Sequence, residues 1–157
     1  LVRLKLGDNR LHGTLPSTLS YLTLLEQLEV NRNNLTGTLP MLSPLTKLKR
    51  LLIQSNQFQG TLSHSLCDLT SLTALNLSKN LLEGTIPACF ANMEQLQTLQ
   101  IQNNRLTGTV PVAIWERMGL NSSMVVCPMG TYGPLTGRQS TSTECLPCPT
   151  AMYLGST

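Results

Sequence analysis

Five cysteines and two histidines are the residues of this 157-residue chain whose types could support metal binding, redox chemistry or catalysis. Cys145-x-x-Cys148 has the spacing of half a zinc site or of a redox motif. However, one other cysteine and no histidine lie nearby, and no thioredoxin-like pattern surrounds the pair. His12 and His64 have no partner at the spacing of a metal site or a catalytic triad, so we expect both on surface turns.

The sequence also lacks the Ser-His-Asp arrangement of a catalytic triad, a pair of carboxylates placed for acid–base catalysis, and a phosphate-binding loop. We therefore expect no enzymatic activity, no cofactor and no metal. The net charge is only +3, without a run of Lys or Arg, which gives nucleic-acid binding little electrostatic support. No stretch of about 18 apolar residues occurs, so a membrane would be reached only through segments outside this chain. The chain opens inside a repeat, and we expect it to be an excerpt.

Asparagine recurs with steps of 24, 23, 24 and 24 residues, and glycine follows each asparagine four residues later. A period in this range predicts a solenoid in which each repeat forms one coil. The coils cover residues 1–24, 25–47, 48–71 and 72–95, and a fifth begins at residue 96. The repeated asparagines are Asn9, Asn33, Asn56, Asn80 and Asn104.

Each coil contains a short alternating segment that predicts a β-strand. In the first coil, Leu4 and Leu6 face inward and Lys5 faces outward, because successive side chains of a strand alternate between its faces. Equivalent strands of successive coils stack about 4.8 Å apart and predict one parallel sheet. The expected strands cover residues 3–6, 27–30, 50–53, 74–77 and 98–101.

Polar and small residues follow each strand, where the chain turns. The asparagine amide offers donors and an acceptor together, so we expect a structural ladder that bonds the backbone of the turn and of the next coil. A Leu-Pro or Ile-Pro pair comes next, and its proline disfavours a helix or a central strand in that segment. The apolar residues that follow the proline have helical spacing and predict short helices on the convex side. Coil two is one residue shorter and contains Pro44, so its back should be irregular.

Residues 69–99, LTSLTALNLSKNLLEGTIPACFANMEQLQTL, resemble a plant-type extracellular leucine-rich repeat. That family includes receptor-like proteins, receptor-kinase ectodomains and polygalacturonase-inhibiting proteins, and its GTLP and GTIP elements separate it from the cytosolic ribonuclease-inhibitor type. The resemblance implies an α/β fold, a right-handed solenoid with one parallel sheet on the concave face. Its convex side is irregular, 3-10 or short helical, and ligands bind the concave sheet. Residues 1–126 form this solenoid, with a partial edge strand at the end.

Cys67 and Cys89 lie 22 residues apart on the backs of adjacent coils, where one turn of the solenoid brings such positions close. The plant-type family carries the same pairing, so we expect a disulfide there. Two buried thiols that serve as small apolar residues are the alternative.

From Cys127 the composition changes to Cys, Pro, Gly, Ser and Thr, and residues 127–157 are predicted to be a truncated cysteine-rich module. A 21-residue repeat of Cys-Pro-x-x-x-Tyr pairs Cys127 with Cys145 and leaves Cys148 to a partner beyond the chain. This unit resembles the repeats of ephrin-receptor-like and tumour-necrosis-factor-receptor-like stalks.

Three N-glycosylation sequons are present, and they accept sugar only in a secreted protein. A glycan on the second would cover part of the concave face, because that asparagine lies within an expected strand. The possible acceptors are Asn34, Asn76 and Asn121.

The outward strand positions form an amide-rich, mildly positive face. We expect Arg32 and Arg50, on neighbouring strands, to form a basic centre with Gln54 that grips a carboxylate, and Leu52 to be an exposed apolar exception. An ordinary solvated sheet face is the alternative. Tyr21, Phe58 and Trp115 are interpreted as packing residues. The predicted binding residues are Lys5, Asp8, Glu29, Arg32, Arg50, Leu52, Gln54, Lys79 and Gln100.

These features predict a recognition module of a cell-surface receptor or secreted defence-type protein, with an extracellular protein, peptide or polar saccharide as partner. A structural or adhesive cell-surface repeat without a dedicated ligand is the alternative. An intracellular scaffold is disfavoured, because the cysteine-rich tail needs an oxidising compartment.

Overall fold

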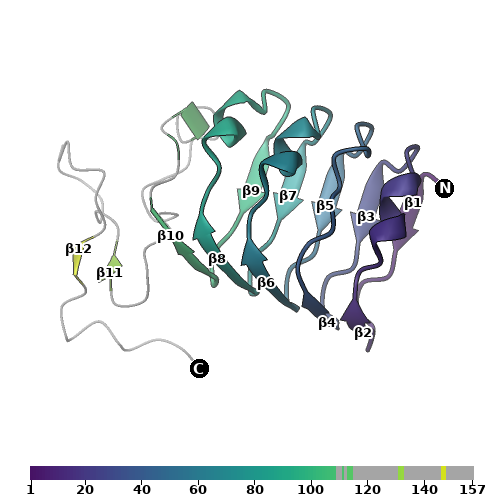
Figure 1. The fold of residues 1–157 in the computed structure, drawn as a ribbon, viewed down its shortest axis with the longest axis horizontal. Helices are drawn as coiled ribbons and strands as arrows, with labels where there is room; N and C mark the ends of the chain where they lie inside the picture. The colour runs from purple at the N-terminus through teal and green to yellow at the C-terminus, as the bar shows by residue number, and fades with distance from the viewer. Residues whose placement is uncertain (109–110, 112, 115–130, 133–145, 148–157) are drawn as a thin grey trace.

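The computed structural model describes residues 1–108, 111, 113–114, 131–132 and 146–147. The repeats form a solenoid in which every coil contributes one strand to each of two parallel five-stranded sheets (Figure 1). The predicted boundary between residues 126 and 127, and the predicted partial edge strand before it, lie outside the described residues. Beyond the repeats, β11 (Thr131–Tyr132) pairs antiparallel with β12 (Leu146–Pro147).

The first sheet, which we call the concave sheet, confirms the five strands that the period predicts. Its parallel register places Leu28, Leu51, Leu75 and Leu99 opposite one another. All four leucines are buried, as are the apolar residues two positions later in coils two to five. The strands are β1 (Arg3–Lys5), β3 (Gln27–Glu29), β5 (Arg50–Leu52), β7 (Ala74–Asn76) and β9 (Thr98–Gln100).

A second parallel sheet follows the asparagine turns, so the expectation of one sheet was incomplete. Its strands are β2 (His12–Thr14), β4 (Asn34–Gly37), β6 (Gln57–Thr61), β8 (Leu81–Thr85) and β10 (Arg105–Thr107). Close stacking requires glycine inside these strands. Gly84 has φ +78°, and a Cβ there would lie 2.9 Å from Cγ2 of Thr61 in the preceding coil. His12 is exposed as expected, but it lies in β2 rather than in a turn.

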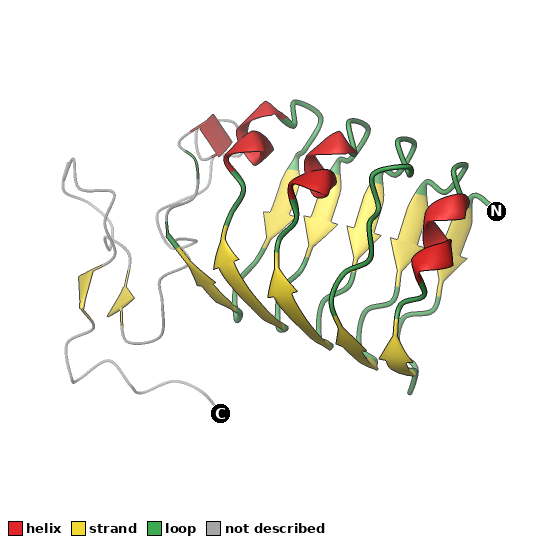
Figure 2. Ribbon diagram, viewed as in Figure 1, coloured by secondary structure: helices red, strands yellow, loops and turns green. Residues whose placement is uncertain are grey.

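Short 3-10 helices form the backs of coils one, three and four, opposite the turns that join the two sheets (Figure 2). They are η1 (Ser17–Tyr21), η2 (His64–Asp68) and η3 (Ala88–Asn92), and His64 is exposed at the start of η2. In η2, Ser63 replaces the usual proline, and its Oγ accepts a hydrogen bond from the Ser65 N–H at 3.2 Å. Coil two has no helix on its back, which confirms its predicted irregularity.

The core is a stack of leucine layers with Phe58 and Phe90 as its largest fully buried side chains. Two predictions of burial fail. Leu6 is 38% exposed, because the first coil has a described neighbour on one side only. Tyr21, expected to pack, is 80% exposed at the end of η1. Trp115 lies outside the described residues.

Candidate functional site

The outward side chains of the concave sheet stack in columns, because parallel strands in register place equivalent residues side by side. The first column consists of Lys5, Glu29, Leu52, Asn76 and Gln100. Backbone hydrogen bonds continue the register past the strand ends, with Arg32 N donating to Gln54 O at 2.9 Å and Lys79 N donating to Gln102 O at 2.9 Å. The second column, two positions after the first, therefore consists of Gly7, Asn31, Gln54, Ser78 and Gln102.

A third column has left-handed backbone geometry in every coil. Its residues precede the repeated asparagines and have φ between 52° and 58°: Asp8, Arg32, Ser55, Lys79 and Asn103. This conformation costs a residue with a Cβ roughly 1–2 kcal/mol. The surrounding backbone bonds impose it, because the chain must leave the concave sheet and direct the next side chain inward. No residue type in this column signals the geometry, apart from asparagine and aspartate.

The expected basic centre does not form. The register pairs Arg50 with Gln27, whereas Arg32 follows its own strand and donates its backbone N–H to Gln54. The two arginines therefore lie at opposite ends of neighbouring strands. Arg32 also pairs with Asp8 at 3.1 Å.

Coils one to three are joined by a second ionic contact on this face. Glu29, whose side chain is 18% exposed, lies 3.8 Å from Lys5 and 3.9 Å from Arg50. One carboxylate thus connects cations of the coils on both sides of it. The charged side chains predicted to bind a ligand are largely occupied with one another in this part of the sheet.

Apart from Arg50, which pairs with Glu29, the concave side chains of coils three to five present amides rather than ion pairs. Asn76 Nδ2 donates to Gln100 Oε1, and Asn76 Oδ1 accepts from the backbone N–H and the Oγ of Ser78 at 3.1 and 2.8 Å. Gln54 Oε1 is buried and accepts no hydrogen bond from the described residues. Leu52, expected to be exposed, is half-buried between these groups and Glu29. We call Gln54, Asn76, Ser78 and Gln100 the amide cluster.

The cluster extends the sequence-based list of binding residues. Ser78 was missing from that list, although it occupies the same position in its coil as Gln54. Beside the cluster, Lys79 is exposed and takes part in no ion pair within the described part of the chain. The structure thus places one unpaired cation next to a group of amide donors and acceptors.

The repeated asparagines support the turns beneath this face, but they reach back to the preceding coil rather than forward to the next. Asn56 Nδ2 donates to Val30 O at 2.9 Å, and its Oδ1 accepts from Leu35 N at 3.0 Å. The same pattern recurs at Asn33, Asn80 and Asn104. Asn9, with no described coil before it, bonds only its own turn.

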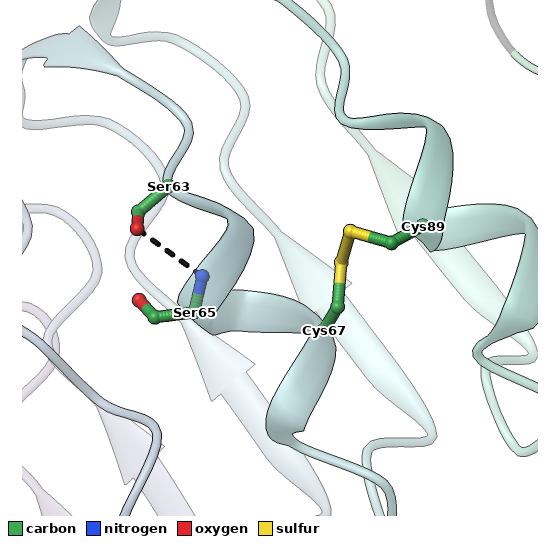
Figure 3. The surroundings of a disulfide bond; sticks show 4 residues. All are labelled: Ser63, Ser65, Cys67 and Cys89. Carbon is green, nitrogen blue, oxygen red and sulfur yellow. Dashed lines mark hydrogen bonds between the residues drawn. A yellow bond between two sulfur atoms is a disulfide. The ribbon is translucent and has the colours of Figure 1, made fainter.

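A disulfide joins Cys67 of η2 to Cys89 of η3, with 6.0 Å between their Cα atoms (Figure 3). The predicted pairing on the backs of adjacent coils is therefore formed. The other predicted pair, Cys127 with Cys145, and the unpaired Cys148 lie outside the described residues, as does the sequon at Asn121.

Over the residues that the structure describes, no group of three or more His, Cys, Asp or Glu side chains could hold a metal ion. Within the same part of the chain, no helix is both long and apolar enough to cross a lipid bilayer.

Comparisons with known proteins agree with this architecture. Residues 46–106 match the family described as leucine rich repeat. Receptor-like protein 34 of Arabidopsis thaliana is 39% identical over 64 residues, which are 40% of this chain and 7% of that protein. Receptor-like protein 43 of the same plant is 40% identical over 60 residues, 38% of this chain and 8% of that protein. The chain thus spans a small fraction of the length of these curated relatives.

Solved structures extend the similarity to most of the chain. The Arabidopsis receptor kinase HAESA, solved with the peptide hormone IDA and the co-receptor SERK1, aligns with a TM-score of 0.72 and 32% identity over 77% of this chain and 20% of that chain. The BIR2 ectodomain from Arabidopsis thaliana aligns with a TM-score of 0.68 and 32% identity over 70% of this chain and 58% of that chain.

The described repeats therefore form a leucine-rich-repeat solenoid. It is similar to the ectodomains of plant receptor kinases and to plant receptor-like proteins.

Proposed function

We propose that this chain is a recognition segment of an extracellular or cell-surface receptor-like protein, and that it binds a peptide or an extended protein segment on the concave sheet. The observation that supports this most directly is the amide cluster beside an unpaired Lys79. The similar HAESA ectodomain, solved with a peptide hormone, supports the ligand class. The role is binding rather than catalysis.

The proposed site lies on coils three to five. An extended peptide exposes backbone N–H and C=O groups in alternation, and carboxamide side chains can satisfy both kinds. Gln54 Oε1 is buried and has no donor among the described residues, and rotation of this carboxamide toward the surface would offer it to a ligand N–H. A buried acceptor without a donor costs about 1–3 kcal/mol, so a ligand that supplies one gains affinity there.

Lys79 gives the site a preferred ligand charge. Its ammonium group has no carboxylate partner among the described residues, whereas Lys5, Arg32 and Arg50 each contact one. An acidic side chain or a terminal carboxylate of the peptide would therefore bind over coil four. The arginines predicted from the sequence contribute by holding the neighbouring coils together.

A displayed library of random peptides, selected on the full chain, tests the proposal. Selected sequences should be acidic, and Gln54→Ala with Lys79→Glu should weaken their binding at least tenfold, which corresponds to about 1.4 kcal/mol. The matched control is Gln59→Ala with Arg105→Glu, which makes the same kinds of change at exposed positions of the second sheet. The control should bind like the unmodified chain, and both variants should melt near its temperature.

The result that contradicts the proposal is equally specific. Binding that survives the concave change and is lost in the control would place the site on the second sheet. Capture of polar oligosaccharides without any peptide would reject the ligand class while keeping the surface.

A further inference from the structure

The two sequons within the described part of the chain occupy different environments. Asn34 is the first residue of β4, and its side chain is exposed. The register of the second sheet pairs it with His12 of the preceding coil, and it pairs Gln57 of the following coil with Thr36; both His12 and Gln57 are exposed. The Asn34 side chain is held by a single hydrogen bond, which Gln57 Nε2 donates to Asn34 Oδ1.

Asn76 is held on all sides. Its side chain is half-buried in β7 on the concave sheet, and Nδ2 donates to Gln100 Oε1. Its Oδ1 accepts from the N–H and the Oγ of Ser78, which is itself only 4% exposed. A sugar that replaced the hydrogen donated to Gln100 would break this bond, and a sugar on the other hydrogen of Nδ2 would have to fit against the half-buried face that holds Asn76 and Ser78.

We infer that Asn34 carries an N-linked oligosaccharide and that Asn76 remains unmodified in the folded protein. The inference rests on the proposed extracellular function, because the sugar donor is a lipid diphosphate of the secretory pathway. In the transfer, Asn34 Nδ2 forms a bond to C1 of the first sugar and gives up one proton. The bond between C1 and the diphosphate oxygen breaks, and the lipid diphosphate leaves.

Folding decides between the two sites after transfer. The middle residue of each sequon, Leu35 or Leu77, is buried, so either sequon must be modified before its coil packs. A sugar on Asn34 then costs at most one exposed contact with Gln57. A sugar on Asn76 adds bulk to a half-buried side chain whose amide is bonded to Gln100 and Ser78, so the modified chain packs this face poorly.

This assignment has a consequence for the proposed binding site. A glycan on β4 extends from the second sheet, which belongs to the other side of each coil. The amide cluster therefore stays free of sugar and accessible to a ligand. The second sheet around Asn34 is correspondingly shielded from contact with partners.

The test uses the full chain, secreted from eukaryotic cells behind a leader, with an Asn-Gly-Thr reporter added after residue 157. Secreted protein is deglycosylated by an amidase in heavy-oxygen water, and the label is mapped by peptide mass spectrometry. The Asn34 peptide and the reporter should both carry label, and the Asn76 peptide should carry none. Thr36→Val should remove one glycan from the intact mass, whereas the matched Ser78→Ala should remove none.

An unlabelled Asn34 beside a labelled reporter would overturn the inference, because the reporter proves that the chain met the transferase. Equal labelling of Asn34 and Asn76 in the secreted pool would overturn it as well. Neither result bears on peptide binding at the concave sheet, and a failure of the binding experiment leaves the glycan map unchanged. The two proposals are thus tested separately.

Discussion

Replacing Asn80 by leucine should destabilise the solenoid much more than the same replacement at Asn9, although both asparagines occupy the same place in the repeat. Asn80 is 6% exposed, and its Oδ1 accepts a hydrogen bond from the N–H of fully buried Phe58 at 3.0 Å. Its Nδ2 donates to the carbonyls of Ile53 and Leu77 at 3.2 and 3.1 Å. Asn9 is exposed, and no N–H of another coil depends on it.

The expected magnitude follows from how these bonds are shared. Ile53 O also accepts from Asn56 Nδ2 at 3.1 Å, and Leu77 O also accepts from Asn104 Nδ2 at 2.9 Å. Both carbonyls therefore keep one donor when Asn80 is lost, and only the Phe58 N–H is left without a partner. Ser78 O, a third acceptor of Asn80 Nδ2 at 3.2 Å, likewise keeps the Ser55 N–H at 3.0 Å. One orphaned buried donor and three weakened acceptors together cost roughly 2–4 kcal/mol. The exposed bonds of Asn9 are worth less than about 1 kcal/mol.

Urea unfolding, followed by far-ultraviolet circular dichroism, measures the free energy of unfolding of both variants. An equal dependence of that free energy on urea concentration shows that the two values can be compared. Hydrogen exchange adds a local readout, because the Phe58 amide should lose most of its protection in Asn80→Leu. An Asn80→Leu protein with an unchanged midpoint, or an Asn9→Leu protein that is equally destabilised, would refute the reasoning.

Three further predictions concern the disulfide on the backs of the coils, the left-handed turns and the second sheet. Replacing Cys67 and Cys89 together by serine should lower the free energy of unfolding by about 3 kcal/mol; an unchanged midpoint in urea would show that the bond does not constrain the chain. Ser55→Gly should be neutral or stabilising by about 1 kcal/mol, because glycine adopts a positive φ without strain. Gly84→Ala should be destabilising, because its Cβ would meet Thr61 Cγ2 at 2.9 Å. A destabilising Ser55→Gly, or a neutral or stabilising Gly84→Ala, in thermal unfolding would contradict the left-handed geometry.

The concave sheet could be predicted because the same signal recurs in every coil. Alternating leucines and a regularly spaced asparagine fix where each strand lies, and the structure places β3 at Gln27–Glu29 within the expected 27–30. The second sheet could not be read in this way. Four of its five strands contain a glycine, such as Gly37, which sequence propensity assigns to a turn. Backbone bonds between coils, rather than local preference, extend these segments.

The arrangement on the concave sheet was only partly predictable. Counting from the ladder asparagines shows that Arg32 precedes Asn33 by one residue and Arg50 precedes Asn56 by six, so the sequence does contain the information that separates the arginines. The ion pairs of Glu29 and the contacts of Asn76 depend on rotamers, which no pattern in the sequence specifies. Tyr21 is exposed because it ends η1 on the outer side of the coil.

The asparagine ladder gives the solenoid a direction. Each turn is completed by the asparagine of the coil that follows it, as the Leu35 N–H is by Asn56 and the Phe58 N–H is by Asn80. During synthesis, a coil would thus leave the ribosome with its turn unfinished and close it only when the next coil arrives. Truncation from the C-terminal side would leave a turn N–H, such as that of Leu35, without its asparagine acceptor. Truncation from the N-terminal side would instead leave strand N–H groups, such as that of Lys49, without the carbonyl of the preceding coil. A designed end module must therefore offer an asparagine-type acceptor to the last turn at the C-terminal side, and backbone carbonyls to the first strands at the N-terminal side.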